Sequence, residues 1–472
     1  MTTQQTLQWL RAYESRNVLF TEPDGSWPIV WERAQGVHVW DAAGKKHLDL
    51  TAAFGVMAAG HANPRVVRAG QQQMAKLLHA MGDVYPHALK ARLARELSRI
   101  TFERWFAADV RRRKETRVRS IRRLTPVSAG KTIFSNSGFE AVEAALKTAM
   151  LATGRGGVIA FEGAYHGLGY GTLSATHREH FRGPFRPQLR EFGHFVPFPT
   201  SVRSSRRKEA HSKIGNCMEP AHVSCGEMEK RVRALFRHER IGAILVEPIQ
   251  ARGGCNIPPP EFLPLLRQLC DEHGALLILD EIYTGFGRTG KWFACEHSST
   301  VPDLICLGKA LTGGFPLSAC VGKAEVMDAA WPASTGEAIH TSTFLGHPVG
   351  CAMALAQIGE IKRLKLCERS AQLGKVLLKR LQSFCLPPSA LRIFPRGVGL
   401  MAGLELLNTD GSPATLETMR LIKAMLHRGF ILLPEGEHGN VLSFTPPLTI
   451  SEAQLNKVLI TLAELLAADS HR

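Results

Sequence analysis

The sequence contains no apolar run of the roughly 18 residues that a membrane-spanning helix requires. Its start, MTTQQTLQWLRAYESRN, lacks the basic segment and apolar stretch of a secretory leader. It also lacks the Arg-rich, acid-free character of an organellar leader. These absences predict a cytoplasmic protein with no membrane partner.

The sequence also lacks a cysteine framework. Its ten cysteines are scattered, and Cys306 and Cys320 lie in apolar segments, which is typical of reduced thiols in a protein core. Cys217, His222 and Cys225 form a small cluster, but their spacing matches no common structural zinc site. We therefore expect no metal.

Acidic residues are scarce relative to basic ones, with 42 Asp and Glu against 58 Lys and Arg, so the formal net charge is +16. Much of the excess lies in one run over residues 111–123, RRRKETRVRSIRR. Nucleic acid or an acidic membrane could bind such a run. Because no aromatic side chains interleave the charges, the run more simply predicts a solvated surface insertion, and nucleic acid is not the expected partner.

What the sequence does contain is enough material for a large folded protein. A chain of 472 residues suggests two or more structural lobes. Its apolar content of 44% and charged content of 21% are ordinary for a globular chain. Composition therefore indicates an ordinary globular protein, and the function has to come from motifs.

Short apolar runs alternate with helical patterns through the middle of the chain. The predicted strands are TIFSNS, GGVIAF, GAILVEPIQ, ALLILD and LICLG, and EFLPLLRQLCDEHG is typical of a helix between two of them. This alternation predicts an α/β fold, with a mostly parallel sheet and helices on both of its faces.

The two ends of the chain predict other structure. Before Pro64, GVHVWDAAGKKHLDLTAAFGV is typical of a hairpin that turns at residues 41–44. Helices are expected from about Pro64 and over residues 89–100. From Pro348 the chain becomes helix-rich, and RGVGLMAGLEL and GNVLSFTPPLTI predict strands of a smaller α+β lobe.

The segment from Gly274 to Phe315 carries the main chemical signal. Asp280 ends one predicted strand and Lys309 follows another, so both stand where open α/β sheets bind ligands. Burial lowers the pKa of a lysine and makes its amine a nucleophile, which can form a Schiff base with a carbonyl substrate or with pyridoxal phosphate. That cofactor needs an acidic residue at its ring nitrogen, and Asp280 supplies one.

A competing motif lies in the same segment. Gly285, Gly287 and Gly290 spell GxGxxG after a strand, which is the fingerprint of dinucleotide binding. That fingerprint should open an amphipathic helix, yet KWFACEHSSTVPD follows without such a pattern. We therefore interpret the glycines as a tight turn.

Around Asp280 and Lys309, DEIYTGFGRTG and DLICLGKALTGGFPLSA resemble the signature of the class III (omega-type) pyridoxal-phosphate-dependent aminotransferases. The resemblance covers the chain from about Gly36 to Leu465, apart from two segments at about 105–130 and 201–228 that look like insertions. It implies the PLP-dependent transferase fold type I, with a large cofactor-binding domain and a smaller α+β domain.

The resemblance also implies how the chain is divided. Residues 1–64 would be the N-terminal segment of the small domain, and residues 65–347 the large domain that binds pyridoxal phosphate. Residues 348–472 would form the C-terminal part of the small domain. Relatives are homodimers with the active site at the interface, so a homodimer is expected here.

The loop and helix start SNSGFEAVEAALK offers a site for an anion, because backbone N–H groups at a helix N-terminus bind negative charge. Ser137 could equally cap the helix, with Glu140 completing a capping box. The family resemblance implies phosphate contacts from Ser137, Gly138 and Phe139. Phe139 replaces a residue that is usually small, so a backbone contact survives there and a hydroxyl contact does not.

Further site residues follow from the same resemblance. Tyr165, in FEGAYHGLGYGTLSATH, would stack on the cofactor ring, and Glu247 in VEPIQ would lie on the substrate side of it. Tyr283 stands where relatives most often have a Gln that contacts the ring hydroxyl, although packing alone could also explain it. Thr343 in HTSTFLGHP would reach the phosphate bound by the partner subunit. Without the family context, Glu247 could be a strand-end charge paired with an Arg.

The implied activity is ping-pong transfer of an amino group from an omega-amino acid or amine to a 2-oxo acid, with Lys309, Asp280 and Glu247 as the catalytic residues. Racemases, aminomutases and decarboxylases of the same lineage keep the lysine and aspartate and remain alternatives. A non-catalytic binder that uses the basic run is the alternative from another class of protein.

The substrate itself is less well specified. Leu168 and Ser443 stand where relatives place arginines that bind a substrate carboxylate. Arg252, Arg178 and Arg182 could bind a carboxylate instead, and the sequence does not choose among them.

Overall fold

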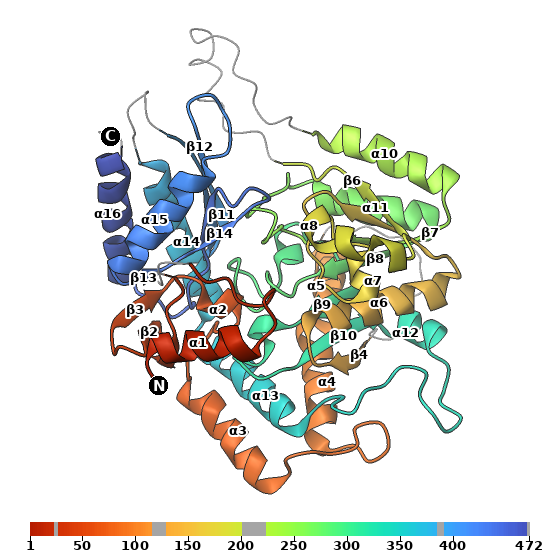
Figure 1. The fold of residues 1–472 in the computed structure, drawn as a ribbon. Coiled ribbons are helices and arrows are strands. Elements are labelled where there is room, and N and C mark those ends of the chain that lie inside the picture. Colours follow the sequence, from red (N-terminus) through yellow and green to blue (C-terminus); the bar gives the residue numbers. More distant parts are fainter. Residues whose placement is uncertain (23–26, 116–128, 201–222, 385–390, 470–472) are drawn as a thin grey trace.

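The computed structural model describes residues 1–22, 27–115, 129–200, 223–384 and 391–469. Its core is a seven-stranded sheet, flanked on one side by two four-stranded sheets built from the two ends of the chain (Figure 1). This arrangement confirms the predicted α/β class with a mostly parallel sheet and a smaller part that contains its own sheets.

The seven-stranded sheet has the order β4-β10-β9-β8-β7-β5-β6. Its strands are β4 (Gly130–Ser135), β5 (Gly157–Phe161), β6 (Gly193–Val196), β7 (Ile241–Val246), β8 (Leu276–Asp280), β9 (Leu304–Leu307) and β10 (Ser318–Lys323). The neighbouring strands β9, β8, β7, β5 and β6 are all parallel to one another. β10 is antiparallel to both of its neighbours, β4 and β9. β6 and β10 are strands that the sequence analysis did not predict.

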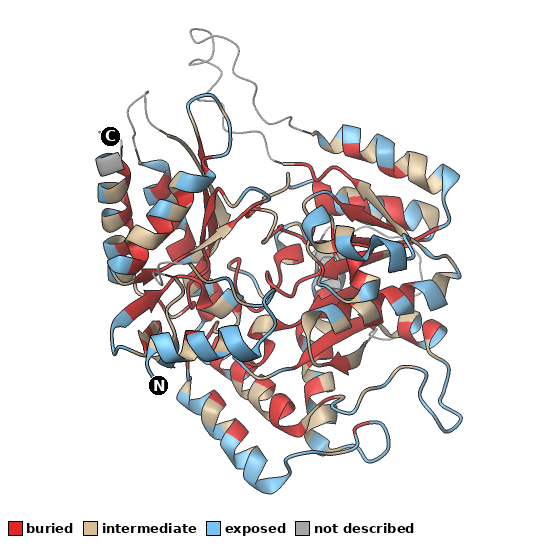
Figure 2. Cartoon of the chain, viewed as in Figure 1, coloured by how far each residue is buried: buried red, intermediate tan, exposed pale blue. Residues whose placement is uncertain are grey.

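Side chains on each central strand alternate between two cores, as a pleated strand requires. On β8, Leu277 and Leu279 join one apolar cluster, while Ile278 between them joins the other. Helix α6 (Gly138–Thr153) covers the Ile278 side, and α4 (Ala88–Ile100), α10 (Cys225–His238) and α11 (Phe262–His273) cover the opposite side. Figure 2 shows the strands of this sheet buried and the outer faces of the helices exposed.

The N-terminal sheet has the order β1-β2-β3-β13 and the C-terminal sheet the order β11-β12-β15-β14. The strands are β1 (Trp31–Gln35), β2 (His38–Asp41), β3 (Lys46–Asp49), β11 (Arg392–Val398), β12 (Met401–Leu407), β13 (Phe430–Ile431), β14 (Leu433–Glu435) and β15 (Val441–Phe444). β2 and β3 confirm the predicted hairpin, and β13 pairs with β3 in parallel. This pairing joins the two ends of the chain in one layer.

Several helices begin where the sequence predicts. At α3, Pro64 occupies the first turn, and the side chain of Asn63 accepts a hydrogen bond from the N–H of Arg65 at 3.0 Å. α13 begins at Pro348 in the same way. The bounds of these two helices are α3 (Pro64–Lys76) and α13 (Pro348–Arg363). Apart from these two and α4, α6, α10 and α11, the α-helices of the described residues are α1 (Thr3–Tyr13), α2 (Ala52–Gly55), α5 (Phe102–Glu115), α7 (Tyr170–Leu173), α8 (Glu179–Arg182), α12 (Ala324–Ala330), α14 (Leu366–Gln382), α15 (Thr415–His427) and α16 (Glu452–Asp469).

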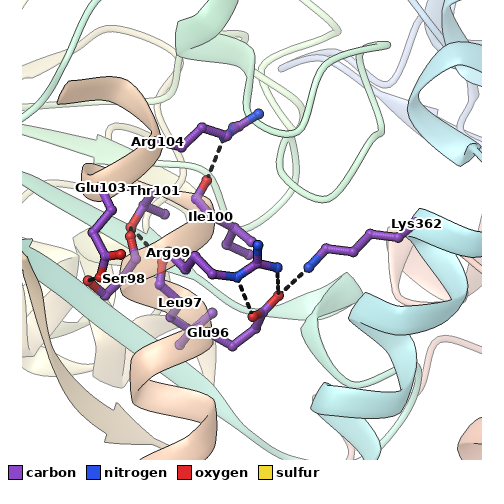
Figure 3. Close-up of polar contacts among 9 residues, drawn as sticks. All are labelled: Glu96, Leu97, Ser98, Arg99, Ile100, Thr101, Glu103, Arg104 and Lys362. Atoms are coloured by element: carbon purple, nitrogen blue, oxygen red, sulfur yellow. Dashed lines mark hydrogen bonds and ion pairs between the residues drawn. The ribbon is translucent and has the colours of Figure 1, made fainter. Parts of the chain in front are cut away.

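Helices α4 and α13 are joined at their polar edge. The carboxylate of Glu96 accepts hydrogen bonds from Arg99, with Nε at 2.8 Å, and pairs with Lys362 of α13 (Figure 3). Exposed ion pairs of this kind contribute little individually, so burial of the apolar faces is what holds the helices together.

The two predicted insertions lie largely outside the described residues, and so does the basic run beyond residue 115. Where residues 105–115 are described, they continue α5, and residues 225–228 form the first turn of α10. Helix therefore extends into both segments that the sequence analysis assigned to insertions. Within the described ranges, no helix is both long and apolar enough to cross a bilayer.

Candidate active site

Asp280 and Lys309 come together at the carboxyl edge of the large sheet. Asp280 is the last residue of β8 and is paired in register with Cys306 of the parallel strand β9. β9 ends at Leu307, and Lys309 follows two residues later in a short turn of 3₁₀ helix. Lys309 has a φ of +35°, which L-residues rarely adopt, and such strain is typical of functional positions.

The surroundings of Lys309 favour its neutral amine. Burial lowers the pKa of Lys309 from its usual value, and the nearby carboxylates of Asp280, Glu247 and Glu435 oppose this shift. Its Nζ lies 4.6 Å from the centre of the Tyr283 ring. An amine with a lowered pKa is a better nucleophile and proton carrier near neutral pH than an ordinary lysine.

Asp280 is held by a histidine to which the sequence analysis gave no role in the site. Nδ1 of His166 lies 2.8 Å from Oδ2 of Asp280, and both side chains are buried. The other oxygen, Oδ1, accepts a hydrogen bond from the N–H of Ile282 at 3.1 Å. The only local signal for His166 was its place beside Tyr165 in a Gly-rich loop, so its partner became visible only in the fold.

Glu247 joins two loops of the site. Its Oε1 accepts a hydrogen bond from the N–H of Tyr165 at 3.1 Å, and its Oε2 accepts one from the N–H of Ala251 at 3.1 Å. Burial raises the pKa of Glu247 to about 7. The carboxyl group therefore positions the Tyr165 turn against the loop that follows β7.

The predicted anion site lies at the start of α6. Glu140 accepts hydrogen bonds from the N–H of Ser137 at 2.7 Å and from its Oγ at 3.0 Å, which confirms the expected link between the helix cap and Glu140. A Cβ on Gly138 would lie 3.0 Å from the side chain of Ile282, which belongs to the turn that follows β8. The helix start therefore packs directly against the Asp280 segment.

The large side chain at position 139 is accommodated by two glycines. A Cβ on Gly167 would lie 2.3 Å from Cβ of Phe139, and one on Gly169 would lie 2.6 Å from its ring. Gly167 also has a φ of +108°, which favours glycine. The departure of Phe139 from the family pattern is thus matched by small residues in the loop that faces it.

The two predicted aromatic residues occupy different environments. The Tyr165 ring is half-buried and packs against Phe181, with the ring centres 5.4 Å apart. Tyr283 is buried, and its hydroxyl lies 3.2 Å from Oγ1 of Thr445. Burial raises the pKa of Tyr283 to about 12, so the hydroxyl keeps its proton at physiological pH.

The other predicted residues, Thr343, Leu168 and Ser443, differ in how far they are exposed. Thr343 is exposed in the loop before α13, and Leu168 is exposed at the Tyr165 turn. Ser443 is buried within β15, where it pairs with Gly403 and Leu433 on the two neighbouring strands. The structure therefore brings Lys309, Asp280, Glu247 and Tyr283 together and leaves Thr343 on the surface of the single chain.

Sequence reasoning also missed Glu435. It ends β14 and its side chain is buried. Arg252 and Arg178 are among its charged neighbours. Its position after an apolar run, LLPE, is the same kind of signal that identified Asp280. The run lies far from the Lys309 motif in the chain, so only the tertiary structure connects them.

The competing motifs find no support in the described residues. The segment 281–293, which contains GxGxxG, forms turns, so the prediction that no helix opens there is confirmed. No group of three His, Cys, Asp or Glu side chains in the described part of the chain could hold a metal. Cys217 and His222 lie outside it, and burial raises the pKa of Cys225 to about 11.

The residues present fit pyridoxal phosphate. They provide an amine with a lowered pKa, a buried carboxylate whose second oxygen a histidine binds, and a helix N-terminus that packs closely against the same turn. This site on a mostly parallel sheet defines a pyridoxal-phosphate-dependent transferase of fold type I. The chain belongs to the aminotransferase class-III family, whose profile matches residues 20–466.

Relatives with assigned names agree with this family. The chain is 35% identical over 446 residues to the 5-aminovalerate aminotransferase DavT of Pseudomonas aeruginosa, covering 93% of each protein. It is also 35% identical to the putrescine aminotransferase of Pectobacterium atrosepticum, covering 92% of this chain and 82% of that protein. Among solved structures, a Bacillus anthracis aminotransferase is 28% identical, with a TM-score of 0.81 and 99% of each chain covered. The protein is therefore an aminotransferase, and its family depends on pyridoxal phosphate.

Proposed function

We propose that this chain moves an amino group from an omega-amino acid or amine to a 2-oxo acid in two half-reactions of ping-pong order. The observation that carries this proposal is the pair Lys309 and Asp280 at the carboxyl edge of neighbouring parallel strands. Relatives named for 5-aminovalerate, 2-aminoadipate and putrescine support the substrate class.

Each catalytic residue has a distinct task in this proposal. Bound pyridoxal phosphate supplies a ring that accepts electrons from the substrate carbon while it stays protonated. Asp280, oriented by His166, keeps that proton at the ring nitrogen. Lys309 carries a proton to and from the substrate carbon, and its lowered pKa makes the neutral amine more available as a base than that of an ordinary lysine. Glu247 holds the Tyr165 turn in place.

The cofactor-binding set follows from the same placement. The backbone of Ser137, Gly138 and Phe139 would hold the phosphate at the start of α6, where the helix dipole favours an anion. The half-buried ring of Tyr165 would cover one face of the cofactor. Tyr283 would support the ring from the side of Lys309, as the 4.6 Å separation of the two side chains suggests.

A homodimer is part of the proposal. Thr343 and Phe344 are exposed, and the neighbouring loop carries the exposed apolar side chains of Leu78, Met81 and Tyr85. His79 joins the two loops, with its ring centre 5.4 Å from that of Phe344. A second copy that covers this surface would bury it and bring Thr343 to the partner's phosphate site.

The described cysteines are free and mostly buried, which fits the reducing cytoplasm expected from the sequence.

The test is an amino-donor panel run with pyruvate and with 2-oxoglutarate, following the carbonyl product. Wild-type holoenzyme should show a visible absorbance band and turn over at least one donor, and Lys309→Ala should lose both. Lys131→Ala is the matched control, since Lys131 is exposed and pairs only with Asp328 among the described residues. A wild-type protein that takes up no pyridoxal phosphate would contradict the proposal.

The alternatives give different results in the same assays. Racemisation of one amino acid without an acceptor would identify a racemase that uses the same lysine. Salt-sensitive retention of nucleic acid that is lost on deleting residues 111–123 would identify a binder.

A further inference from the structure

A pair of opposite charges spans the junction between the large sheet and the C-terminal sheet. Arg252 belongs to the loop after β7, and Glu435 ends β14. Nη1 of Arg252 lies 3.6 Å from Oε2 of Glu435, which is too long for a hydrogen bond. The two groups therefore attract one another without being fixed together, and an incoming anion can compete for the guanidinium.

Three hydrogen bonds anchor the main chain at Ala251 and Arg252. The carbonyl oxygen of Arg252 accepts hydrogen bonds from Nη2 of Arg178 at 2.7 Å and from the N–H of Gly436 at 3.2 Å. The preceding residue, Ala251, donates its N–H to Glu247 at 3.1 Å. These hydrogen bonds place the base of the Arg252 side chain, and the side chain as a whole is 32% exposed.

The guanidinium lies toward the reacting centre. Its central carbon is 5.6 Å from the centre of the Tyr165 ring. The charge of Arg252 also lowers the pKa of Lys309, and that of Glu435 raises it, so both charges act on the amine. A ligand group on Arg252 would therefore be part of the same site as Lys309.

The side chain of Glu435 is only 4% exposed. A buried charge is stable only when opposite charges compensate it, and its positive neighbours are Arg252, Arg178 and Lys309. The site therefore already holds one carboxylate of its own beside two arginines and the amine of Lys309. A substrate carboxylate is the chemical group that could take over this role at Arg252, with two parallel N–H···O bonds.

The other two candidate arginines are committed elsewhere. Arg182 is buried over the ring of Phe195 at 4.9 Å, and its Nη2 lies 3.0 Å from Glu191. Arg178 uses Nη2 to hold the carbonyl of Arg252. The structure thus makes the choice that the sequence left open.

We propose that Arg252 binds the terminal carboxylate of the substrate, and that Glu435 neutralises Arg252 when the substrate carries no carboxylate there. This inference rests on the proposed function and specifies its substrate class: omega-amino acids with a free carboxylate are preferred over amines of the same length. It assigns to this loop the role for which Leu168 and Ser443 are chemically unsuited, since neither side chain carries a positive charge.

The first experiment compares two donors on holoenzyme, 5-aminovalerate and pentylamine, which differ by the carboxylate. Wild type should have the higher kcat/KM with 5-aminovalerate. Arg252→Gln should lower that value about 10- to 100-fold, mainly through KM, because one charge-assisted pair is lost, and should leave pentylamine nearly unchanged. Arg252→Lys should restore part of the loss, and Arg186→Gln, at an exposed arginine paired with Glu179, is the control.

Glu435→Gln should change the KM for 5-aminovalerate in the opposite direction to Arg252→Gln. Without the competing carboxylate, KM for 5-aminovalerate should fall. Pentylamine should be a poorer donor for Glu435→Gln than for wild type, because the charge of Arg252 stays uncompensated beside it. If both donors lose activity equally in Arg252→Gln, the residue is only structural and the proposal is overturned.

A binding measurement keeps this proposal separate from the proposed function. Calorimetry with valerate, which has the carboxylate and no amine, should show binding to wild-type holoenzyme and at least about tenfold weaker binding to Arg252→Gln. Equal binding to both proteins, or none to wild type, overturns the subsite whatever the activity. A wild type that binds valerate through Arg252 but transfers no amino group would contradict the proposed function alone.

Discussion

Nδ1 of His166 lies 2.8 Å from Oδ2 of Asp280, in the interior beneath the candidate cofactor site. His166 is itself fixed, because its N–H donates a hydrogen bond to Oγ1 of Thr176 at 3.0 Å. The orientation of the Asp280 carboxylate is therefore set from the Tyr165 loop, which lies more than a hundred residues away in the sequence. This relationship makes His166 a positioning residue for Asp280.

Replacing His166 should weaken cofactor retention without unfolding the protein. In His166→Phe, Oδ2 of Asp280 loses its histidine partner and the buried carboxylate becomes less stable, at a cost of about 1–3 kcal/mol. The increase in Tm on adding pyridoxal phosphate should shrink. His166→Asn can keep an N–H near the position of Nδ1 and should recover much of that increase; equal loss in both variants would show that the ring shape matters instead.

Glu247 should make the apoprotein less stable as pH rises from about 4.5 to about 7. The folded state holds the Glu247 proton until its pKa of about 7, whereas the usual value of 4.5 applies to the unfolded chain, so the unfolded state binds fewer protons in this window. Glu247 alone should account for a loss of about 3 kcal/mol across the window. Urea unfolding at stepped pH measures it.

Glu247→Gln should reduce this pH dependence, because an amide does not titrate. Burial also raises the pKa of Glu281 to about 7, so the variant should keep a second contribution of the same sign. The exposed Glu14→Gln serves as the control and should leave the slope unchanged. Identical slopes in wild type and Glu247→Gln would refute the assignment of this titration.

Tyr283 should act through its ring more than through its hydroxyl. The hydroxyl lies beside Thr445, and Oγ1 of Thr445 also donates to the carbonyl of Thr51 at 3.2 Å. Tyr283→Phe should therefore cost about 1 kcal/mol of stability and retain the cofactor. Tyr283→Leu removes the aromatic surface under Lys309 and should weaken retention, measured by the visible absorbance left after dialysis. Loss of the cofactor in Tyr283→Phe would favour a direct bond from the hydroxyl.

Gly374 should tolerate no side chain. A Cβ there would lie 2.1 Å from the carbonyl oxygen of Gly399, so the backbone of α14 or of the β11–β12 turn would have to move. Gly374→Ala should destabilise the protein by about 3 kcal/mol or prevent its folding. Gly359→Ala, at an exposed position of α13 with no atom within 4 Å, should instead add about 0.5–1 kcal/mol. If Gly374→Ala left the free energy of unfolding unchanged, α14 and the β11–β12 turn would be able to move apart.

Much of the fold could be predicted because its signals are local. The apolar runs that end at Asp280 and precede Lys309 are short and continuous, as buried parallel strands require. Pro64 and Pro348 marked helix starts because proline fits a first turn. β6 and β10 were missed, since GHFV and SACVGK are brief and resemble loops until neighbouring strands pair with them.

The sequence by itself determined the cofactor chemistry, because Asp280 and Lys309 belong to one contiguous segment whose spacing is set by two strands and a turn. It could not decide what surrounds them. His166 reaches Asp280, Glu247 joins the Tyr165 turn to Ala251, and Glu435 faces Arg252 only because distant parts of the chain meet at one sheet edge. Such pairings depend on crossovers and on the packing of two lobes, which no local pattern encodes. The tertiary structure therefore decided which charges surround the lysine and which arginine lies beside the Tyr165 ring.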